Sequence, residues 1–339
     1  MIKTVLVTGG SGYIGSWVVK MLLERGFEVK VAVRHLSRSN SYSHLINIAG
    51  ERTELLSFFE ADLLVDGSYD DAAASSDAII HIASPFTLRY KNAERDLIRP
   101  AVEGTRNVLN AANRSSTVKK VVLTSSIAAV YGDNADLQDL NAEEFAEEFF
   151  NHSSTLKHQP YSYSKLLAEK EAWNICGMQN KWELVVINPT LVMGPSLSVN
   201  SNSESLKIMD DLLRGWYRAG VPALQFGFVD VRDVAHAHVQ ALKIENARGR
   251  HILMSQVASF LDIANIIRSE FSGKFKLPRK TLPKFFVMLV GWMFGFSVKF
   301  VLRNVGFAIK INNRRSVEEL GLEYIPLQTT VKDMVKQMA

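Results

Sequence analysis

The chain has 339 residues, with 39 Lys and Arg against 35 Asp and Glu and a formal net charge of +4. At 47% hydrophobic and 22% charged residues it has the composition of a globular protein, which excludes a disordered, collagen-like or coiled-coil chain, and the small net charge gives no support for nucleic-acid binding. The single cysteine, Cys176, excludes an internal disulfide and a CxxC site, and favours a reducing compartment.

Short apolar strands alternate with helical stretches through the first half of the chain. The predicted strands lie at residues 4–8, 29–33, 56–60, 78–83, 120–125 and 184–188. Nearly continuous Val, Ile and Leu in these strands is typical of a parallel sheet with helices on both faces. We predict an α/β fold, with a Rossmann-type doubly wound parallel sheet over residues 1–188. A smaller C-terminal substrate lobe follows over 189–339, and some of its segments return to the first domain.

A glycine-rich turn follows the first predicted strand. Thr8-Gly-Gly-Ser-Gly-Tyr-Ile-Gly15 precedes a predicted helix at 16–24. Gly9 can form the tight turn, Gly12 allows a pyrophosphate to approach the backbone, and Gly15 allows the helix to pack closely on the strand. A purely structural turn is the alternative, but the position favours dinucleotide binding. The candidate contacts are Gly9, Gly12, Tyr13, Ile14 and Gly15.

The end of the second strand distinguishes the two nicotinamide dinucleotides. An acidic residue there binds the ribose of NAD, whereas an Arg accommodates the 2′-phosphate of NADP. The chain has Arg34 at this place, Arg38 nearby, and no acidic residue between Glu28 and Glu51. A guanidinium matches the geometry of a phosphate. A solvated surface arginine is the alternative, but the position favours NADP(H) bound by Arg34.

Three side chains form a candidate catalytic set. Tyr161 and Lys165 are four residues apart on a predicted helix and therefore share one face. We expect the Lys165 ammonium to lower the pKa of Tyr161 from its usual value of ~10 towards neutrality. Ser126 follows strand 120–125, at the sheet edge where such folds bind ligands. Ser125 is the alternative, and the alternation of strand side chains favours Ser126.

Together these motifs resemble the extended short-chain dehydrogenase/reductase family. The matching segments are Gly9-x-x-Gly12-x-x-Gly15, Arg34, Ala61-Asp62-Leu63, His81-Ile82-Ala83, Thr124-Ser125-Ser126, Tyr161-x-x-x-Lys165, Asn188-Pro189-Thr190 with Gly194-Pro195, and Val229 to Val234. Within the family the chain is similar to the dihydroflavonol-reductase-like branch, which includes cinnamoyl-CoA and aliphatic carbonyl reductases. The resemblance implies further cofactor contacts. These are Asp62 and Leu63 at the adenine, Ala83 and Lys165 at the nicotinamide ribose, and Pro189 to Val192 at the nicotinamide ring.

The resemblance also implies a reaction. Hydride passes from the nicotinamide to a carbonyl carbon, Ser126 and Tyr161 hold the carbonyl oxygen, and Tyr161 donates the proton. Tyr131 occupies the place of the substrate-binding asparagine of flavonoid reductases, so we do not expect a flavonoid substrate. The candidate pocket walls are Phe86, Tyr131, Met193 and the loop 196–226. They suit a small hydrophobic ketone or aldehyde, and ordinary core packing is the alternative for each of them.

Two other features have simpler interpretations. The eight histidines are scattered without the spacing of metal ligands, so we expect no metal site, and His81 is expected to be a core residue within its strand. The run from Asp133 to Glu148 carries seven carboxylates and no Lys or Arg. It is interpreted as a solvated excursion before the catalytic helix and not as a cation site.

A basic segment near the C-terminus contains the longest apolar run. Residues 274–315 carry ten Lys and Arg and no Asp or Glu, and include the run Phe285 to Val298. That run is short for a spanning helix, and the chain starts with a strand and not a signal peptide, so we expect a cytoplasmic protein. Basic flanks around an aromatic stretch are typical of interfacial helices. Peripheral membrane contact through 274–315 and a buried helix of the substrate lobe both stay open.

Two other functions also stay open. Membrane-associated 3β-hydroxysteroid or sterol dehydrogenases share these motifs, and sterol oxidation would distinguish them. A non-catalytic NADPH-binding regulator is the alternative of another class, although it would not need the set of Ser126, Tyr161 and Lys165.

Overall fold

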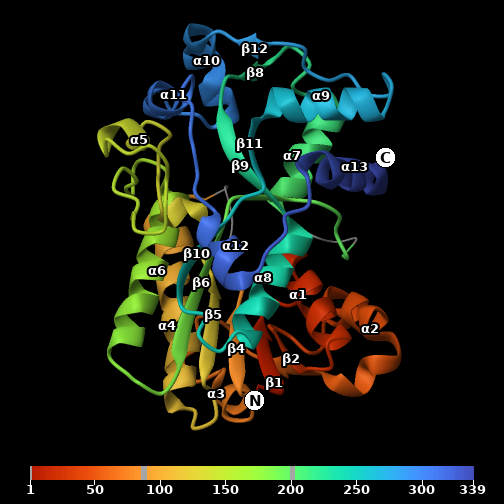
Figure 1. The fold of residues 1–339 in the computed structure, drawn as a ribbon, viewed down its shortest axis with the longest axis vertical. Coiled ribbons are helices and arrows are strands. Elements are labelled where there is room, and N and C mark those ends of the chain that lie inside the picture. Colours follow the sequence, from red (N-terminus) through yellow and green to blue (C-terminus); the bar gives the residue numbers. More distant parts are fainter. Residues whose placement is uncertain (1, 85–89, 199–202) are drawn as a thin grey trace.

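The computed structural model describes residues 2–84, 90–198 and 203–339, apart from the side chain of Phe294. It has a large lobe built on one sheet and a smaller lobe at the opposite end from the N-terminus (Figure 1). The C-terminus lies on the smaller lobe.

A seven-stranded sheet in the order β10-β6-β5-β4-β1-β2-β3 forms the centre of the large lobe. Every neighbouring pair is parallel. The strands are β1 (Thr4–Thr8), β2 (Glu28–Val33), β3 (Leu56–Glu60), β4 (Ala78–His81), β5 (Lys120–Thr124), β6 (Glu183–Pro189) and β10 (Gly249–Leu253). The strand order reverses between β1 and β4, which confirms the doubly wound sheet. Ligands bind at the carboxyl ends of the strands next to such a reversal.

The predicted strands agree with the observed ones to within two residues. The largest difference is in β4, which ends at His81 and not at residue 83. The backbone N–H of Ala83 donates to the Thr8 hydroxyl at 3.2 Å and not to a neighbouring strand. The sequence analysis did not predict β10, which joins the sheet beside β6 from the second half of the chain.

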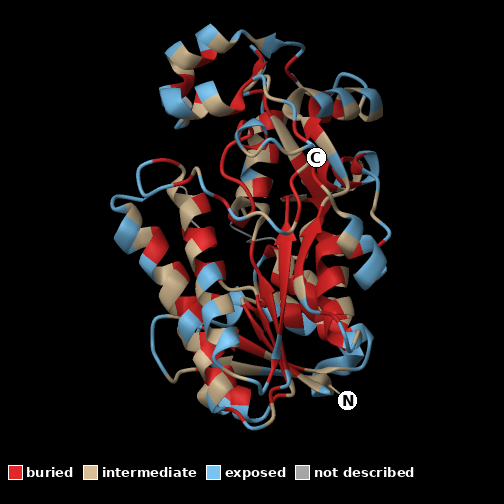
Figure 2. Ribbon diagram, turned by 60° about the vertical axis from the view of Figure 1, so that its left-hand side comes forward, coloured by how far each residue is buried: buried red, intermediate tan, exposed pale blue. Residues whose placement is uncertain are grey.

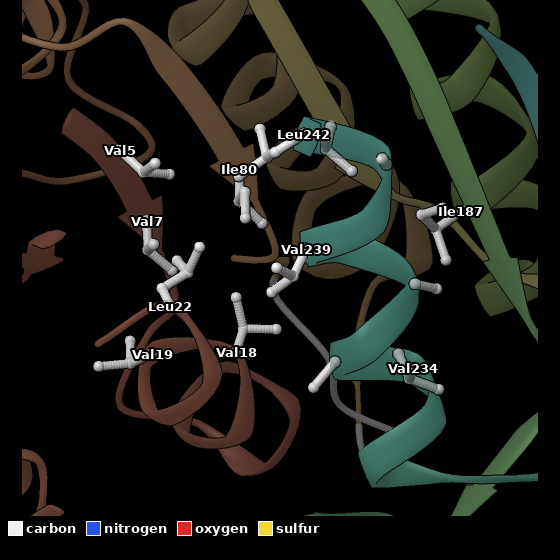
Figure 3. Packing of buried hydrophobic residues seen from close by; sticks show 14 of the residues in the cluster. Val5, Val7, Val18, Val19, Leu22, Ile80, Ile187, Val234, Val239 and Leu242 are labelled. Atoms are coloured by element: carbon white, nitrogen blue, oxygen red, sulfur yellow. The ribbon is translucent and has the colours of Figure 1, made fainter. Parts of the chain in front are cut away.

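Helices cover both faces of the sheet. One face carries α1 (Tyr13–Glu24), α2 (Ser43–Ala49) and α8 (Val231–Lys243), and the other carries α3 (Asp70–Ala74), α4 (Arg99–Arg114) and α6 (Pro160–Gly177). Val18 and Leu22 of α1 lie opposite Val239 and Leu242 of α8, with strand residues beside them (Figure 3). The buried strands between the two helical layers are evident in Figure 2.

The smaller lobe has its own core. The sheet β11-β9-β7 is made of β7 (Leu191–Met193), β9 (Gln225–Asp230) and β11 (Gln256–Ser259), and it packs against α7 (Glu204–Leu213), α9 (Phe260–Glu270) and α13 (Leu327–Met338). A strand pair, β8 (Val221–Pro222) and β12 (Thr281–Leu282), leads to α10 (Lys284–Val290) and α11 (Val298–Asn304) at the far end. The helix α12 (Arg314–Leu320) returns to β10. No helix among the described residues is long and apolar enough to cross a bilayer.

Candidate active site

The glycine turn between β1 and α1 is closely packed. Gly9 has φ +69°, and a Cβ atom there would lie 2.8 Å from the Ala83 nitrogen. A Cβ on Gly15 would lie 2.1 Å from the Gly9 carbonyl oxygen, so α1 packs on this turn only with glycine at that position. At Gly12, the N-cap of α1, the nearest atom to such a Cβ is the Gly9 oxygen at 3.3 Å. The first turn of α1 has no acidic residue, so its N-terminus suits an anion.

Two aromatic side chains of α1 hold this turn against the smaller lobe. The Tyr13 hydroxyl donates to the Gly194 carbonyl at 2.7 Å, and Trp17 Nε1 donates to the Pro195 carbonyl at 2.8 Å. Burial raises the pKa of Tyr13 well above its usual value. Sequence reasoning missed Trp17, whose position one helical turn after Tyr13 is the signal that could have identified it.

The proposed adenosine contacts lie at the ends of β2 and β3. Arg34 is exposed directly after β2. Burial and the nearby Asp62 raise the pKa of Tyr69, whereas Arg34 lowers it, so both charges lie near that ring. Asp62 Oδ1 accepts from the Leu64 backbone N–H at 2.8 Å. The Leu63 carbonyl accepts from Asn107 of α4 at 2.7 Å, which fixes the loop after β3.

The structure brings the three catalytic candidates together. Ser126 follows β5, and its hydroxyl caps the short helix η4 (Ile127–Ala129) by accepting from the Ala128 N–H at 3.1 Å. The side chains of Ser126 and Tyr161 are hydrogen-bonded. Tyr161 is the second residue of α6, and Lys165 Nζ lies 6.0 Å from the centroid of its ring. The Ser125 hydroxyl donates instead to Glu169, away from Tyr161.

The expected lowering of the Tyr161 pKa is wrong for this structure. Burial raises the pKa of Tyr161 to about 12, and the hydrogen bond with Ser126 only partly opposes that rise. Burial also lowers the pKa of Lys165 to about 8, an effect that the Glu169 carboxylate opposes. The physical reason is that both groups lose water, which destabilises the charged form of each. At neutral pH the phenol is therefore protonated, and most of the lysine is charged.

Glu169 is a functional candidate that the sequence analysis missed. It is almost fully buried and accepts from Ser125 and, at 2.8 Å, from Asn188 Nδ2. It also forms an ion pair with Arg250 of β10 at 2.6 Å. The spacing of Tyr161, Lys165 and Glu169, four residues apart each time, is the signal that could have revealed it.

A small pocket lies beside Lys165. Both candidate ribose contacts, Ala83 and Lys165, line this pocket. Its other lining residues include Ser84, Thr105, Ser125 and Glu169. His81 also lines it and is a satisfied core residue, as expected, with Nδ1 lying 2.7 Å from the Thr8 hydroxyl. Burial lowers the pKa of His81 to about 3, and Lys165 contributes, so the ring is neutral. Pro189 ends β6 at this edge of the sheet, and Val192 lies in β7.

Two of the candidate substrate residues, Tyr131 and Met193, lie in packed surroundings. The Tyr131 ring stacks on Phe145 with centroids 3.9 Å apart, and burial raises its pKa. Met193 is fully buried in the core of the smaller lobe. Phe86 lies outside the described residues, as does part of the loop 196–226.

The acidic run is not simply a solvated excursion, because its first two carboxylates are buried. Asp133 and Asp136 have no exposed surface, and both form ion pairs with Arg303 of α11, at 2.8 and 2.9 Å. Burial acts to raise the pKa of Asp133, but hydrogen bonds from His158, Asn304 and Arg303 hold it below its usual value. The compensating cation lies far along the chain, where sequence spacing does not reveal it.

Comparisons with known proteins agree with this fold. The model of the NAD dependent epimerase/dehydratase family matches residues 5–254. Cinnamoyl-CoA reductase CAD2 of Medicago truncatula is 36% identical, over 99% of this chain and 95% of that protein. Dihydroflavonol 4-reductase of Arabidopsis thaliana is 30% identical, over 95% of this chain and 81% of that protein. The crystal structure of Gre2 from Candida albicans in complex with NADPH superimposes with a TM-score of 0.81 at 30% identity, over 99% of this chain and 98% of that one.

Proposed function

We propose a reaction for this chain, which belongs to the NAD dependent epimerase/dehydratase family and is an oxidoreductase of the extended short-chain dehydrogenase/reductase type. It is similar to cinnamoyl-CoA and dihydroflavonol reductases. We propose that it reduces a hydrophobic ketone or aldehyde to the alcohol with NADPH. The observation that carries this proposal is the hydrogen bond between Ser126 and Tyr161 at the carboxyl end of β5, with Lys165 one helical turn further along α6.

The residues present fit the cofactor. Gly12 at the N-terminus of α1, with Tyr13, Ile14 and the tight glycines around it, would hold the pyrophosphate. The exposed guanidinium of Arg34 would bind the 2′-phosphate. The remaining contacts are Asp62 and Leu63 at the adenine, Ala83 and Lys165 at the ribose, and Pro189 and Val192 at the nicotinamide. The bound cofactor supplies the hydride that the protein itself lacks.

Tyr161 acts as the proton donor in this proposal. A phenol with a pKa of about 12 is protonated at neutral pH, so its O–H can donate to the carbonyl oxygen of the substrate. As the oxygen gains negative charge, the proton moves from Tyr161 to it and the alcohol forms. The Ser126 hydroxyl donates a second hydrogen bond to the same oxygen. The Lys165 ammonium stabilises the phenolate that remains.

We propose an apolar substrate with Tyr131 as its candidate contact among the described residues, whereas the position of Met193 in the core of the smaller lobe favours ordinary packing for that side chain. Tyr131 supports the exclusion of flavonoids, because its ring is stacked on Phe145 and does not offer the amide of an asparagine. An apolar ketone or aldehyde needs only the two hydroxyls for its carbonyl group, and apolar walls for the rest.

We also propose that the enzyme is cytoplasmic and contacts membranes peripherally through residues 274–315. The described residues include seventeen large hydrophobic side chains that are exposed, and seven of them lie between 285 and 302. They are Phe285, Phe286, Leu289, Trp292, Met293, Val298 and Leu302. Residues 280–302, which carry these side chains, include Lys280, Lys284 and Lys299 and no acidic residue, so a second copy of this surface would repel it, whereas an anionic lipid surface attracts it.

A screen of NADPH consumption over aryl, aliphatic and steroid carbonyls tests the proposed reaction. We expect turnover with an apolar aldehyde or ketone, and the alcohol as product. Oxidation of a 3β-hydroxysterol with NADP⁺ or NAD⁺, without reduction of small carbonyls, would support the sterol dehydrogenase alternative. Tight NADPH binding without turnover of any carbonyl or sterol would support the regulator.

A further inference from the structure

The end of α11 in the smaller lobe is bonded to the segment that follows the catalytic serine. The Arg303 carbonyl accepts from the Ala135 N–H at 3.0 Å, and Asn304 Oδ1 accepts from the Asn134 N–H at 2.9 Å. The Arg303 guanidinium bonds to the buried carboxylates of this segment. The segment after Ser126 is therefore held by a helix of the other lobe.

Asp133 is the centre of this contact. From the smaller lobe, Arg303 Nε donates to its carboxylate at 2.8 Å and Asn304 Nδ2 at 2.6 Å. From the segment before α6, Gln159 Nε2 donates to it at 2.6 Å, and His158 Nε2 lies 2.9 Å from it. One buried carboxylate thus joins α11 to the two residues that precede the catalytic helix.

Gln159 sets the start of that helix. It is the N-cap of α6 and has φ 54° and ψ 57°, a left-handed conformation that is sparsely populated for a residue other than glycine. Such a conformation persists where its surroundings hold it. Here the Gln159 amide donates to the Gly132 carbonyl at 2.7 Å as well as to Asp133. Tyr161 follows two residues later, so the direction in which Tyr161 leaves this turn depends on these bonds.

A second carboxylate stabilises the loop around Asp133. Asp136 accepts from the backbone N–H groups of Gly132 at 3.0 Å and Asp133 at 3.1 Å. It also pairs with Arg303 Nη2 at 2.9 Å. The same guanidinium therefore neutralises both buried charges, and its loss would leave them without their main cationic partner.

We infer that Asp133, Gln159 and Arg303 are positioning residues that fix the Tyr161 hydroxyl against Ser126, so that α11 of the smaller lobe controls the geometry of proton transfer. The inference rests on the proposed role of Tyr161 as proton donor. A displacement of ~1 Å at a reacting group can cost ~10²-fold in rate. We expect a ~10-fold loss of kcat when one link of this chain is removed.

The test is a double-mutant cycle with Tyr161→Phe. Gln159→Asn keeps a residue that tolerates the left-handed conformation, but its shorter amide does not reach Asp133. Arg303→Met removes the guanidinium. Each variant should lower kcat ~10-fold in the native background, with the dissociation constant for NADPH nearly unchanged. In the Tyr161→Phe background, measured at high enzyme concentration, each should change the residual rate less than ~2-fold.

Arg106→Met is the matched control. Arg106 belongs to α4 and pairs at 2.7 Å with Glu171 of the catalytic helix α6. Glu171 lies on a turn of α6 away from Tyr161. Arg106→Met should leave kcat unchanged in both backgrounds. If Arg303→Met does not fold, Gln159→Asn decides the result.

Equal losses with and without the Tyr161 hydroxyl would overturn the inference, because a general structural defect acts on both backgrounds alike. Full activity in Tyr161→Phe alone would overturn the proposed proton donor and this inference together. If Tyr161→Phe loses activity but the effects of the second substitution and of Tyr161→Phe on the rate are additive, the inference is overturned and the proposed proton donor stands.

Discussion

The Tyr161 hydroxyl combines a buried setting with a hydrogen-bond partner, and both determine its chemistry. Burial keeps it protonated, and Ser126 orients it. We expect Tyr161→Phe to lower kcat by ~10² to 10⁴, the usual cost of losing a general acid. NADPH binding should stay nearly intact, since the ring and the helix remain. Steady-state turnover and cofactor titration check this, and wild-type turnover in the variant would contradict the role of Tyr161.

The protonation state of Lys165 determines the pH dependence that we expect for the reduction. Its ammonium, with a pKa of about 8, loses its proton as the pH rises, whereas Tyr161, with a pKa of about 12, stays protonated. If the charged form is needed, kcat/KM for reduction should be flat from pH 6 to 7 and fall ~10-fold per pH unit above ~8. Lys165→Arg should remove this fall, because a guanidinium stays charged. A wild-type profile that is flat to pH 9.5 would contradict the prediction.

The side chain at position 34 determines the preference that we expect between NADPH and NADH. Arg34→Asp should weaken NADPH binding and favour NADH, because a carboxylate repels the 2′-phosphate and accepts from the free ribose hydroxyls. Arg52→Asp makes the same change of charge at another exposed arginine and serves as the control. Dissociation constants for both cofactors check this. An unchanged ratio in Arg34→Asp would show that Arg34 does not contact the phosphate.

At the scale of elements, two glycines at the junction of β1 and α1 are expected to have different roles, Gly15 in packing and Gly12 in cofactor binding. Gly15→Ala places a Cβ 2.1 Å from the Gly9 oxygen, so α1 must move. Overpacking of this kind costs ~1–3 kcal/mol, and we expect a clear loss of thermal stability. Gly12→Ala meets the Gly9 oxygen at 3.3 Å, a tight contact that needs a shift of only a few tenths of an ångström, so it should lose less stability than Gly15→Ala and weaken NADPH binding.

Gly177→Ala is the control for both variants. This glycine ends α6, and a Cβ there would have no neighbour within 4 Å. Its thermal midpoint and cofactor affinity should match those of the wild type. Equal stability of Gly15→Ala and Gly177→Ala would contradict the close packing of α1 on the turn.

At the scale of the whole molecule, exposed apolar surface is concentrated at one end, within a segment rich in basic residues. Residues 274–315 hold ten of the 39 basic residues and none of the 35 acidic ones. The helices α10 and α11 lie at the end of the molecule opposite the N-terminus, with exposed surface around a buried Val287 (Figures 1 and 2). An apolar tip with a basic surround is the arrangement that inserts into the headgroup region of an anionic bilayer.

We therefore expect the protein to sediment with vesicles that contain anionic lipid, and raised salt to weaken this binding by screening. Trp292→Ala should reduce it, because that side chain is 74% exposed, and so should Lys280→Glu with Lys299→Glu. Met178→Ala, at a methionine that is 84% exposed at the end of α6 in the large lobe, is the control. Turnover of a soluble carbonyl should not change. Absence of sedimentation at low salt would contradict membrane contact.

The sequence by itself determined the elements whose signals are local. The strands, the glycine turn, Arg34 and the spacing of Tyr161 and Lys165 follow from periodicity and neighbouring residues, and six of the seven parallel strands were predicted. Ser126 could be preferred to Ser125 because strand side chains alternate. Each of these depends on residues a few positions apart, so the chain order contains the information.

The tertiary structure alone decided the features that depend on distant partners and on burial. Asp133 pairs with Arg303, Glu169 with Arg250, and β10 joins the sheet beside β6. The pKa of Tyr161 rises where neighbouring charge predicted a fall, because the free energy of removing a phenolate from water depends on the atoms that enclose it. Sequence spacing contains no measure of that enclosure, and it cannot show which acidic residue meets a cation more than a hundred residues away.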